Sequence, residues 1–483
     1  MSRFDRSPFV TMTEQLPSRR ARSDVAMNRK HIVESASELL TGEPRASMSQ
    51  VARAANVSRG TLYRHFPSRA DLLAAVSEHA RSTAVTTSED RLRPAGELAR
   101  ATPTPLSVAD VLNKVPPHLL GDQIVAEAQR IAGVSSAAVY LVDLEGTRLM
   151  RLAGPTSFPK TLPAKLAVGT EIPREGLPAL EATIEDHLPG AVSAPLLLRG
   201  RALGVVVAVG SDADGLADLA YEAAAALSLA EDYTDHLDAA RRVRATSPAA
   251  EIQQNLLPPR IVRTNGALIA GNVLPGYEIG GDWFDYAENP AGTWIGMADA
   301  EGSGTRAAAL ASVALGAFRS GRHQSLDLPA MIRLMDTVVR EFSEGATVTT
   351  TIGFWVPPTS TFSWISCGEL GPIVVNGKGE GDLLEGHRLP PLGQLEEDAE
   401  LVARERRLED GDRLVLVSDG IVDRAYPEGN ALSIDGVVDA VRDAPFASAA
   451  GAVSAVEAVI HDMNPDELLD DATIAVLTPV LRS

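Results

Sequence analysis

The sequence contains very little cysteine, few aromatic residues and no long apolar run. Cys367 is the single cysteine among 483 residues, so an intramolecular disulfide is impossible and a reducing compartment is expected. The longest apolar stretches, such as 203–210 and 223–230, are much too short to span a bilayer. No apolar segment follows the N-terminal arginines, so a secretory signal is not predicted. The sequence therefore predicts a cytoplasmic protein without membrane segments.

The net charge of −20 is distributed unevenly along the chain. Residues 1–100 hold 16 Lys and Arg against 11 Asp and Glu, a net charge of +5, so the other 383 residues carry −25. A basic end on an acidic body is expected when that end alone meets nucleic acid. The length suggests roughly three domains.

Periodicity and composition divide the chain into six segments. We predict a disordered tail (1–27), an all-α head (28–86), a linker (87–105), an α+β middle domain (106–235), a helical linker (236–250) and a third domain of alternating strands and helices (251–483). In the middle domain, residues 191–198 and 202–210 flank a short turn and predict a β-hairpin.

A long alanine-rich helix is predicted over 215–244, at the exit of the middle domain. Its apolar and small residues recur at spacings of three and four: Leu216, Leu219, Ala220, Ala223, Ala226, Leu227, Ala230 and Tyr233. Such a stripe packs either against the same helix of a second copy, which would give a homodimer, or back onto its own domain. Both arrangements remain open at this point.

Four aspartates lie in separate short contexts along the last two-fifths of the chain: Asp282, Asp299, Asp419 and Asp470. Most have glycine close by, and two follow apolar runs, 293–297 and 413–417, that we predict to be strands. Mg²⁺ and Mn²⁺ prefer oxygen ligands, and a site for them needs close backbone approach, which glycine permits. The four contexts together predict one metal site.

The order of motifs in this region is similar to that of the stage II sporulation protein E-like branch of the metal-dependent Ser/Thr phosphatases, the PPM superfamily. The motifs that carry the resemblance lie at 253–258, 280–285, 299–304, 367–372, 390–393, 411–412, 418–423 and 470–473. The resemblance implies an α/β/β/α sandwich in which two Mn²⁺ or Mg²⁺ ions activate a water that attacks phosphoserine or phosphothreonine. It also implies, as the usual substrate, a phosphorylated anti-sigma-factor antagonist.

The resemblance also assigns metal ligands by motif position. Asp299 would bridge the two ions, with the backbone carbonyl of Ala300 beside it. Asp419 and Asp470 would complete the coordination of one ion, and Asp282 would complete that of the other. Asp471 is the alternative to Asp470, which is favoured because the superfamily's ligand precedes the Asn/Asp-x-Thr step.

Three motifs depart from the family pattern. Ser303 stands where histidine is most common, Glu369-Leu370 replaces the usual histidine-proline, and Asp423 replaces glutamate. None of these is an assigned ligand, so we expect the metal site to persist and substrate affinity to differ.

Residues 50–69 resemble the DNA-binding domain of TetR-type repressors, with a Val-Ser-x-Gly-Thr-Leu-Tyr-x-His-Phe core at 57–66. The third helix of such a domain lies in the major groove. The candidate contacts to duplex DNA are Ser58, Arg59, Thr61, Tyr63, Arg64, His65 and Arg69. Asn56 replaces the usual glycine, and asparagine tolerates a left-handed turn. The alternative is a helical bundle kept for protein contacts.

The middle domain loosely resembles GAF-type sensory domains, and it would serve either as a sensor or as a dimerisation scaffold. The preferred hypothesis is a cytoplasmic signalling phosphatase whose activity is set by the two preceding domains. The alternative is a TetR-like DNA-binding transcriptional regulator with a non-catalytic phosphatase-like domain.

Overall fold

The chain forms two compact units, Met1–Thr104 and Pro105–Ser483. The computed structural model describes residues 107–480 apart from short gaps at 211–212, 275–279, 369–370, 385–388, 427–428, 430 and 464–470. In the first unit it describes 30–33, 35–36, 39, 46, 48–66, 72 and 75. The predicted tail (1–27) and, apart from Leu72 and Ala75, the end of the predicted head (67–86) lie outside these residues, as does the predicted linker (87–105).

The head contains a helix-turn-helix. Helix α2 (Met48–Ala54) and helix α3 (Arg59–His65) are joined by a turn in which Asn56 has φ 52°, the left-handed conformation predicted for it. Ser58 caps α3, because its side chain accepts a hydrogen bond from the Thr61 backbone amide at 3.1 Å. Leu62 and Phe66 are buried in the small core of the head.

The middle domain is built on a six-stranded sheet with helices on both faces. The strand order is β3-β2-β1-β6-β4, with β5 also paired to β6. The strands are β1 (Ser136–Val142), β2 (Arg148–Ala153), β3 (Thr161–Pro163), β4 (Ile172–Pro173), β5 (Ala191–Leu198) and β6 (Arg201–Val209). One face packs against α5 (Val108–Leu112), α6 (Leu120–Ala128) and α8 (Ala213–Ala230), and the other against α7 (Leu177–His187). The predicted hairpin is confirmed by the antiparallel pairing of β5 with β6.

The single helix predicted over 215–244 is wrong. Helix α8 ends at Ala230, a 3₁₀ turn covers Glu231–Tyr233, and α9 (Asp235–Arg241) starts anew. The break lies at Thr234, whose backbone is extended (φ −155°, ψ 135°) and whose side chain caps α9 by accepting from the His236 amide. Residues 242–247 are not helical, so the predicted helical linker (236–250) is interrupted.

The apolar stripe of this segment packs onto its own domain. Leu216, Leu219, Ala223 and Leu227 are buried in the core shared with the sheet. Tyr233 is 80% exposed and takes no part in that core. Of the two arrangements left open by the sequence, the structure therefore has the second.

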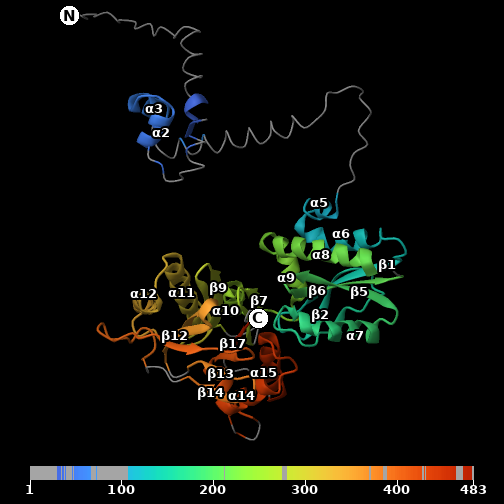
Figure 1. Cartoon of the computed structure of the whole chain (residues 1–483). Coiled ribbons are helices and arrows are strands. Elements are labelled where there is room, and N and C mark those ends of the chain that lie inside the picture. The colour runs from blue at the N-terminus through green and yellow to red at the C-terminus, as the bar shows by residue number, and fades with distance from the viewer. Residues whose placement is uncertain are drawn as a thin grey trace, which may run out of the picture. The chain divides into compact units, whose positions relative to one another are not determined.

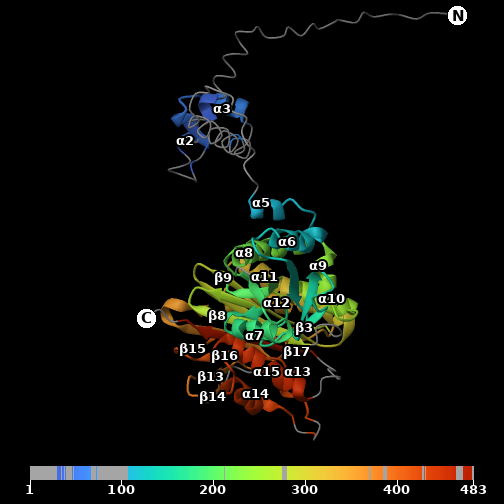
Figure 2. The same ribbon diagram turned by 90° about the vertical axis from the view of Figure 1, so that its right-hand side faces the viewer.

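The third domain consists of two facing antiparallel sheets covered by helices. The first sheet has the order β15-β12-β11-β10-β9 and the second β14-β13-β16-β17-β8-β7. Phe284, Trp355 and Leu416 are among the side chains buried between them. Helices α11 and α12 cover the first sheet and α14 and α15 cover the second, as Figure 1 shows from the front and Figure 2 from the side. The predicted α/β/β/α sandwich is confirmed.

The bounds of these elements match the predicted strands at 293–297 and 413–417, which lie within β10 and β16. The strands are β7 (Ile261–Thr264), β8 (Ala267–Leu274), β9 (Asp282–Asn289), β10 (Gly292–Ala300), β11 (Val348–Val356), β12 (Thr361–Cys367), β13 (Ile373–Val375), β14 (Gly381–Leu383), β15 (Arg404–Arg407), β16 (Arg413–Val417) and β17 (Ala472–Pro479). The helices are α10 (Pro248–Leu256), α11 (Gly304–His323), α12 (Leu328–Phe342), α13 (Asp419–Val422), α14 (Ser433–Arg442) and α15 (Ala449–Met463). The sequence predicts helices over 305–319 and 329–342, which lie within α11 and α12, and it did not predict α13, α14 or α15.

The middle and third domains share a buried contact within the second unit. Val168, from the middle domain, is fully buried in the core that includes β8 and α15. Glu171 accepts a hydrogen bond from the Ile261 amide at 2.8 Å and pairs with Arg201 at 2.8 Å. The two domains are therefore held together by the apolar packing of Val168 and by the hydrogen bond from the Ile261 amide to Glu171, whose charge Arg201 of the same domain balances.

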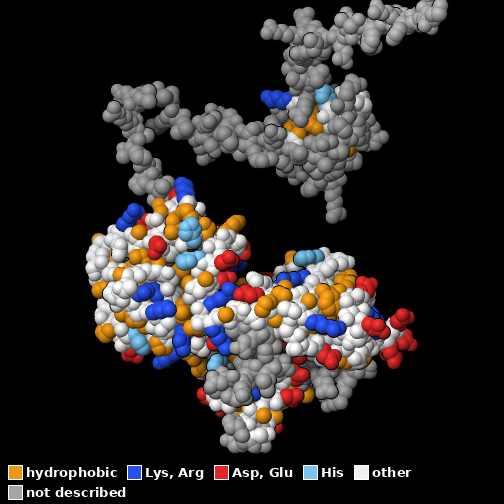
Figure 3. Space-filling view, turned by 180° about the vertical axis from the view of Figure 1, so that it is seen from behind, with side chains coloured by type: hydrophobic (Ala, Val, Ile, Leu, Met, Phe, Trp, Pro, Cys, Tyr) orange, Lys and Arg blue, Asp and Glu red, His pale blue; other side chains and the backbone are white. Residues whose placement is uncertain are grey.

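The described surface carries charged side chains of both signs. In the view from behind, Lys and Arg lie interspersed with Asp and Glu over much of the second unit (Figure 3). No helix among the described residues is long and apolar enough to cross a membrane.

Candidate active site

The hairpin of β9 and β10 places two of the predicted aspartates opposite each other. Asp282 begins β9, Asp299 lies near the end of β10, and the two are cross-strand partners. Directly opposed residues in antiparallel strands point to the same face, with their Cβ atoms about 5 Å apart. The Ala300 amide donates to the Gly281 carbonyl at 3.1 Å, which fixes this end of the hairpin. The structure thus brings Asp282 and Asp299 together.

The third aspartate, Asp419, follows β16 and begins the short helix α13. Its neighbour Ser418 is tied to β17, because the Thr473 amide donates to the Ser418 hydroxyl at 2.9 Å and the Ser418 amide donates to the Thr473 carbonyl at 2.9 Å. A Cβ on Gly420 would lie 1.9 Å from the Asp471 carbonyl oxygen. Only glycine fits there, so the Ser-Asp-Gly sequence allows the two segments to approach closely.

Asp471 is buried and its Oδ2 atom accepts three hydrogen bonds. The donors are the Gly281 amide at 2.8 Å, the Asp282 amide at 3.2 Å and the Gln253 side-chain amide at 2.8 Å. One carboxylate oxygen therefore joins the start of β17 to the start of β9 and to α10. Asp470, the favoured metal ligand of this motif, lies outside the described residues.

The buried carboxyl of Asp282 is strongly perturbed. Burial raises its pKa well above the usual range, and the negative charges of Asp299 and Asp471 raise it further. The Thr473 hydroxyl donates to Asp282 and opposes this effect. Three carboxylates crowded in this way are stabilised by a proton or by a cation.

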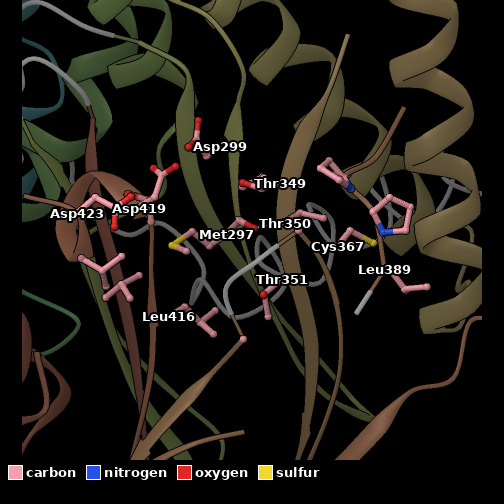
Figure 4. A pocket seen from close by; sticks show the side chains of 18 residues that line it. Met297, Asp299, Thr349, Thr350, Thr351, Cys367, Leu389, Leu416, Asp419 and Asp423 are labelled. Atoms are coloured by element: carbon pink, nitrogen blue, oxygen red, sulfur yellow. Dashed lines mark hydrogen bonds between the residues drawn. The ribbon is translucent and has the colours of Figure 1, made fainter. Parts of the chain in front are cut away.

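A pocket of about 840 Å³ opens at this edge of the sheets. Figure 4 shows Asp299, Asp419 and Asp423 on one side of it and Cys367 and Leu389 on the other. Sequence reasoning noted Asp423 only as a departure from the family pattern, although its place in Ser-Asp-Gly-Ile-Val-Asp could have indicated that it lines the pocket. Sequence reasoning also assigned no role to Thr349, the partner of Asp299 on β11, or to Gln253, which donates to Asp471.

The pocket holds the carboxylates of Asp299, Asp419 and Asp423 among apolar side chains. Within the residues that the structure describes, no group of three or more His, Cys, Asp or Glu converges tightly enough to hold a metal ion. The donors that are present are carboxylates and backbone carbonyls, which Mg²⁺ and Mn²⁺ prefer. The negative charges of Asp299 and Asp471 raise the pKa of Asp282, so this cluster would favour a neighbouring positive charge.

The buried thiol in the pocket is not poised for nucleophilic attack. Burial raises the pKa of Cys367 to about 12, with a smaller contribution from the charge of Asp336. A thiolate, rather than a thiol, is the nucleophile in cysteine chemistry. Cys367, held as a thiol, is therefore a poor nucleophile in this pocket.

The candidate DNA contacts of the head are partly described. The hydroxyls of Ser58 and Thr61 lie 2.8 Å apart and share a hydrogen bond at the start of α3. His65 ends the same helix. The side chains of Arg59, Tyr63 and Arg64 and the whole of Arg69 lie outside the described residues.

Comparison with protein families identifies two parts of the chain. Residues 289–479 match the model of the family "Stage II sporulation protein E (SpoIIE)", and residues 32–76 match that of the "Bacterial regulatory proteins, tetR family". The third domain is thus similar to the SpoIIE-type phosphatases, and the head is similar to TetR-type helix-turn-helix domains. Within the phosphatases, the similarity is to the SpoIIE type, so both resemblances drawn from the motifs are confirmed.

Several solved structures are similar at low identity. The SiaA PP2C domain of Pseudomonas aeruginosa is 19% identical, with a TM-score of 0.41, over 48% of this chain and 94% of that one. The RsbU and RsbW domains of a Mycobacterium tuberculosis protein are 20% identical, with a TM-score of 0.40, over 45% of this chain and 62% of that one. The SpoIIE phosphatase domain of Bacillus subtilis with part of its regulatory domain is 12% identical, with a TM-score of 0.39, over 74% and 87%. The search of curated proteins gave no match.

Proposed function

We propose that the third domain is a Mn²⁺- or Mg²⁺-dependent phosphatase that acts on phosphoserine or phosphothreonine in a protein. The observation that carries this proposal is the meeting of Asp282, Asp299, Asp419 and Asp471 from four separate segments at one edge of two sheets. Phosphate monoesters hydrolyse extremely slowly without help, so charge neutralisation is the main task of such a site.

Each residue of the site has a proposed role. Asp299 would be shared between two cations, with the Ala300 carbonyl beside it, and Asp282 would hold one ion. Asp419 and Asp470 would hold the other, while Asp471 orients the start of β9 through its three hydrogen bonds. When bound, the two cations supply an activated water and offset charge on the phosphoryl oxygens. The chain itself needs no covalent nucleophile, in line with the raised pKa of Cys367.

The proposal extends to the substrate class, the oligomeric state, the domain boundaries and the location of the protein. The similarity to stage II sporulation protein E supports a phosphorylated anti-sigma-factor antagonist as the substrate class. A homodimer is expected because helix-turn-helix motifs normally bind two half-sites as a pair. We further propose the domain boundaries 28–86, 106–235 and 251–483, with a GAF-like sensor in the middle, and a cytoplasmic location.

The test is hydrolysis of p-nitrophenyl phosphate and of a phosphopeptide with and without Mn²⁺. Asp299→Asn and Asp419→Asn should each lower turnover by more than about 100-fold, since loss of a metal ligand exceeds the usual effect of its supporting groups. Asp382→Asn is the matched control, because this exposed aspartate on β14 does not line the pocket. Retention of most activity in either ligand variant would disprove the two-metal assignment.

A second candidate function is DNA binding, which the capped helix α3 and the left-handed Asn56 turn support. A duplex bound by the full chain should be released steeply as salt rises. Replacing Arg59 and Arg64 together by alanine should weaken binding. If Mn²⁺-dependent hydrolysis is absent while DNA binding persists, the chain is a TetR-like regulator with a non-catalytic phosphatase-like domain.

A further inference from the structure

Helix α10 (Pro248–Leu256) carries a buried glutamine to which the proposed metal chemistry assigns no role. Gln253 is 1% exposed and belongs to the 253–258 motif that opens the third domain. Ser247 caps the helix by accepting from the Ala250 amide at 3.1 Å, and α10 packs against α11. The capped start of α10 and its packing against α11 therefore fix the position of Gln253.

The side-chain amide of Gln253 reaches the candidate active site. Its Nε2 atom donates to Asp471 Oδ2 at 2.8 Å and to the Asp282 backbone carbonyl at 3.1 Å. Both hydrogens of the amide are thus used on the two segments that border the site. An asparagine would be one methylene too short to reach both acceptors, and a glutamate would place a second carboxylate against Asp471.

The orientation of this amide follows from its surroundings. The reversed orientation would direct Oε1 at the Asp471 carboxylate and lose both hydrogen bonds. In the orientation observed, Oε1 is buried without a hydrogen-bond partner among the described residues. Leaving a buried acceptor unpaired lowers stability, and an apolar side chain of the same length would avoid that cost. The amide is therefore better explained by what Nε2 holds than by packing.

We propose that Gln253 is a positioning residue for the divalent-cation site. It holds the Asp471 carboxylate in one orientation and fixes the backbone of Asp282, whose side chain is a proposed ligand. Groups that orient metal ligands set metal affinity even though they do not touch the ion. This inference rests on the proposed phosphatase function.

The experiment compares Gln253→Met with Gln254→Met in the full chain. Methionine keeps the length of glutamine and removes the donors. Gln254 is the next residue of the same helix, and its Oε1 accepts from Arg260 Nη2 at 2.7 Å rather than contacting the carboxylates. The measurements are Mn²⁺ affinity by electron paramagnetic resonance of the free ion, thermal unfolding without metal, and turnover of p-nitrophenyl phosphate across Mn²⁺ concentrations.

Gln253→Met should weaken Mn²⁺ binding about 10-fold or more, while Gln254→Met stays within about 2-fold of the parent. The unfolding midpoint without metal should change little, because the unpaired Oε1 is removed along with the two donors. Turnover should recover at high Mn²⁺. A merely structural residue would instead lower the unfolding midpoint and leave the affinity of the folded fraction unchanged.

Equal Mn²⁺ affinity in Gln253→Met and Gln254→Met, beside an active parent, would overturn the positioning role alone. A parent that neither binds Mn²⁺ nor hydrolyses phosphate would overturn the proposed function and this inference with it. If Gln253→Met does not fold, Gln253→Asn decides. This variant keeps an amide that cannot reach both acceptors, so parent-like Mn²⁺ affinity in it would also refute the proposal.

Discussion

Glu457 is a buried acid whose ionisation should make the third domain less stable as the pH rises. It lies on α15, is 7% exposed, and its Oε1 accepts a hydrogen bond from Asn272 Nδ2 at 2.6 Å. Burial raises its pKa to about 8 from an ordinary value of 4.5, against the opposing effects of the Asn272 hydrogen bond and the charge of Arg260. The perturbation to make is Glu457→Gln, which keeps an acceptor for Asn272 and cannot ionise.

The sign of the effect follows from the raised pKa. Below about pH 4 the carboxyl is protonated in both the folded and the unfolded chain, so it contributes no pH dependence. Between pH 4.5 and about pH 8 only the unfolded chain releases the proton, so the free energy of unfolding falls as the pH rises. Above about pH 8 both states are ionised, and the free energy of unfolding levels off. The shift in the pKa of Glu457 corresponds to a total loss of about 4 to 5 kcal/mol in the free energy of unfolding. The Gln variant lacks this loss.

The assay is thermal unfolding of the parent and Glu457→Gln at pH 5, 7 and 9. We expect similar midpoints at pH 5 and a higher midpoint for the variant at pH 9, by about 8 °C or more for a domain of this size. Asp462→Asn, an exposed change on the same helix, serves as the control and should show no such divergence. A gain that is absent at pH 9, or equally large at pH 5, would show that ionisation of Glu457 does not cause this pH dependence.

Three further predictions test the site, the exit helix and the head. Gly420→Ala should lower Mn²⁺-dependent turnover by more than about 10-fold, because the new Cβ would lie 1.9 Å from the Asp471 carbonyl oxygen. Kinetics like those of the parent would contradict this close approach. Leu227→Asp should unfold the middle domain rather than merely separate a dimer, because Leu227 is 1% exposed in that domain's own core; sedimentation and circular dichroism distinguish the two results. Duplex DNA binding by the full chain, followed by fluorescence anisotropy, should weaken by about 10-fold or more between 50 and 200 mM salt, and salt-independent binding would exclude phosphate contacts by the basic head.

Much of the architecture could be predicted from local sequence because the signals are local. The strand over 413–417 is a short apolar run, the hairpin over 191–209 has a turn at Arg199-Gly200, and Asn56 tolerates the left-handed turn that its position requires. The break at Thr234 had a local signal as well, a threonine before Asp and His, but the alanine-rich periodicity on both sides concealed it. The motif order likewise predicted the similarity to the SpoIIE and TetR families that the comparisons found.

The sequence by itself determined which residue types border the candidate site and in what order the chain supplies them. Only the tertiary structure decided how they meet: the β9–β10 register sets Asp282 opposite Asp299, and the adjacency of β16 and β17 brings Asp419 near Asp471. Tertiary structure also assigned Asp471 its three donors and gave Gln253 its two acceptors, across sequence separations of 190, 189 and 218 residues for Asp471. The physical reason is that local preference fixes a strand or a turn within a few residues, whereas strand register and sheet packing are set by the burial of whole faces, and those faces alone bring distant carboxylates together.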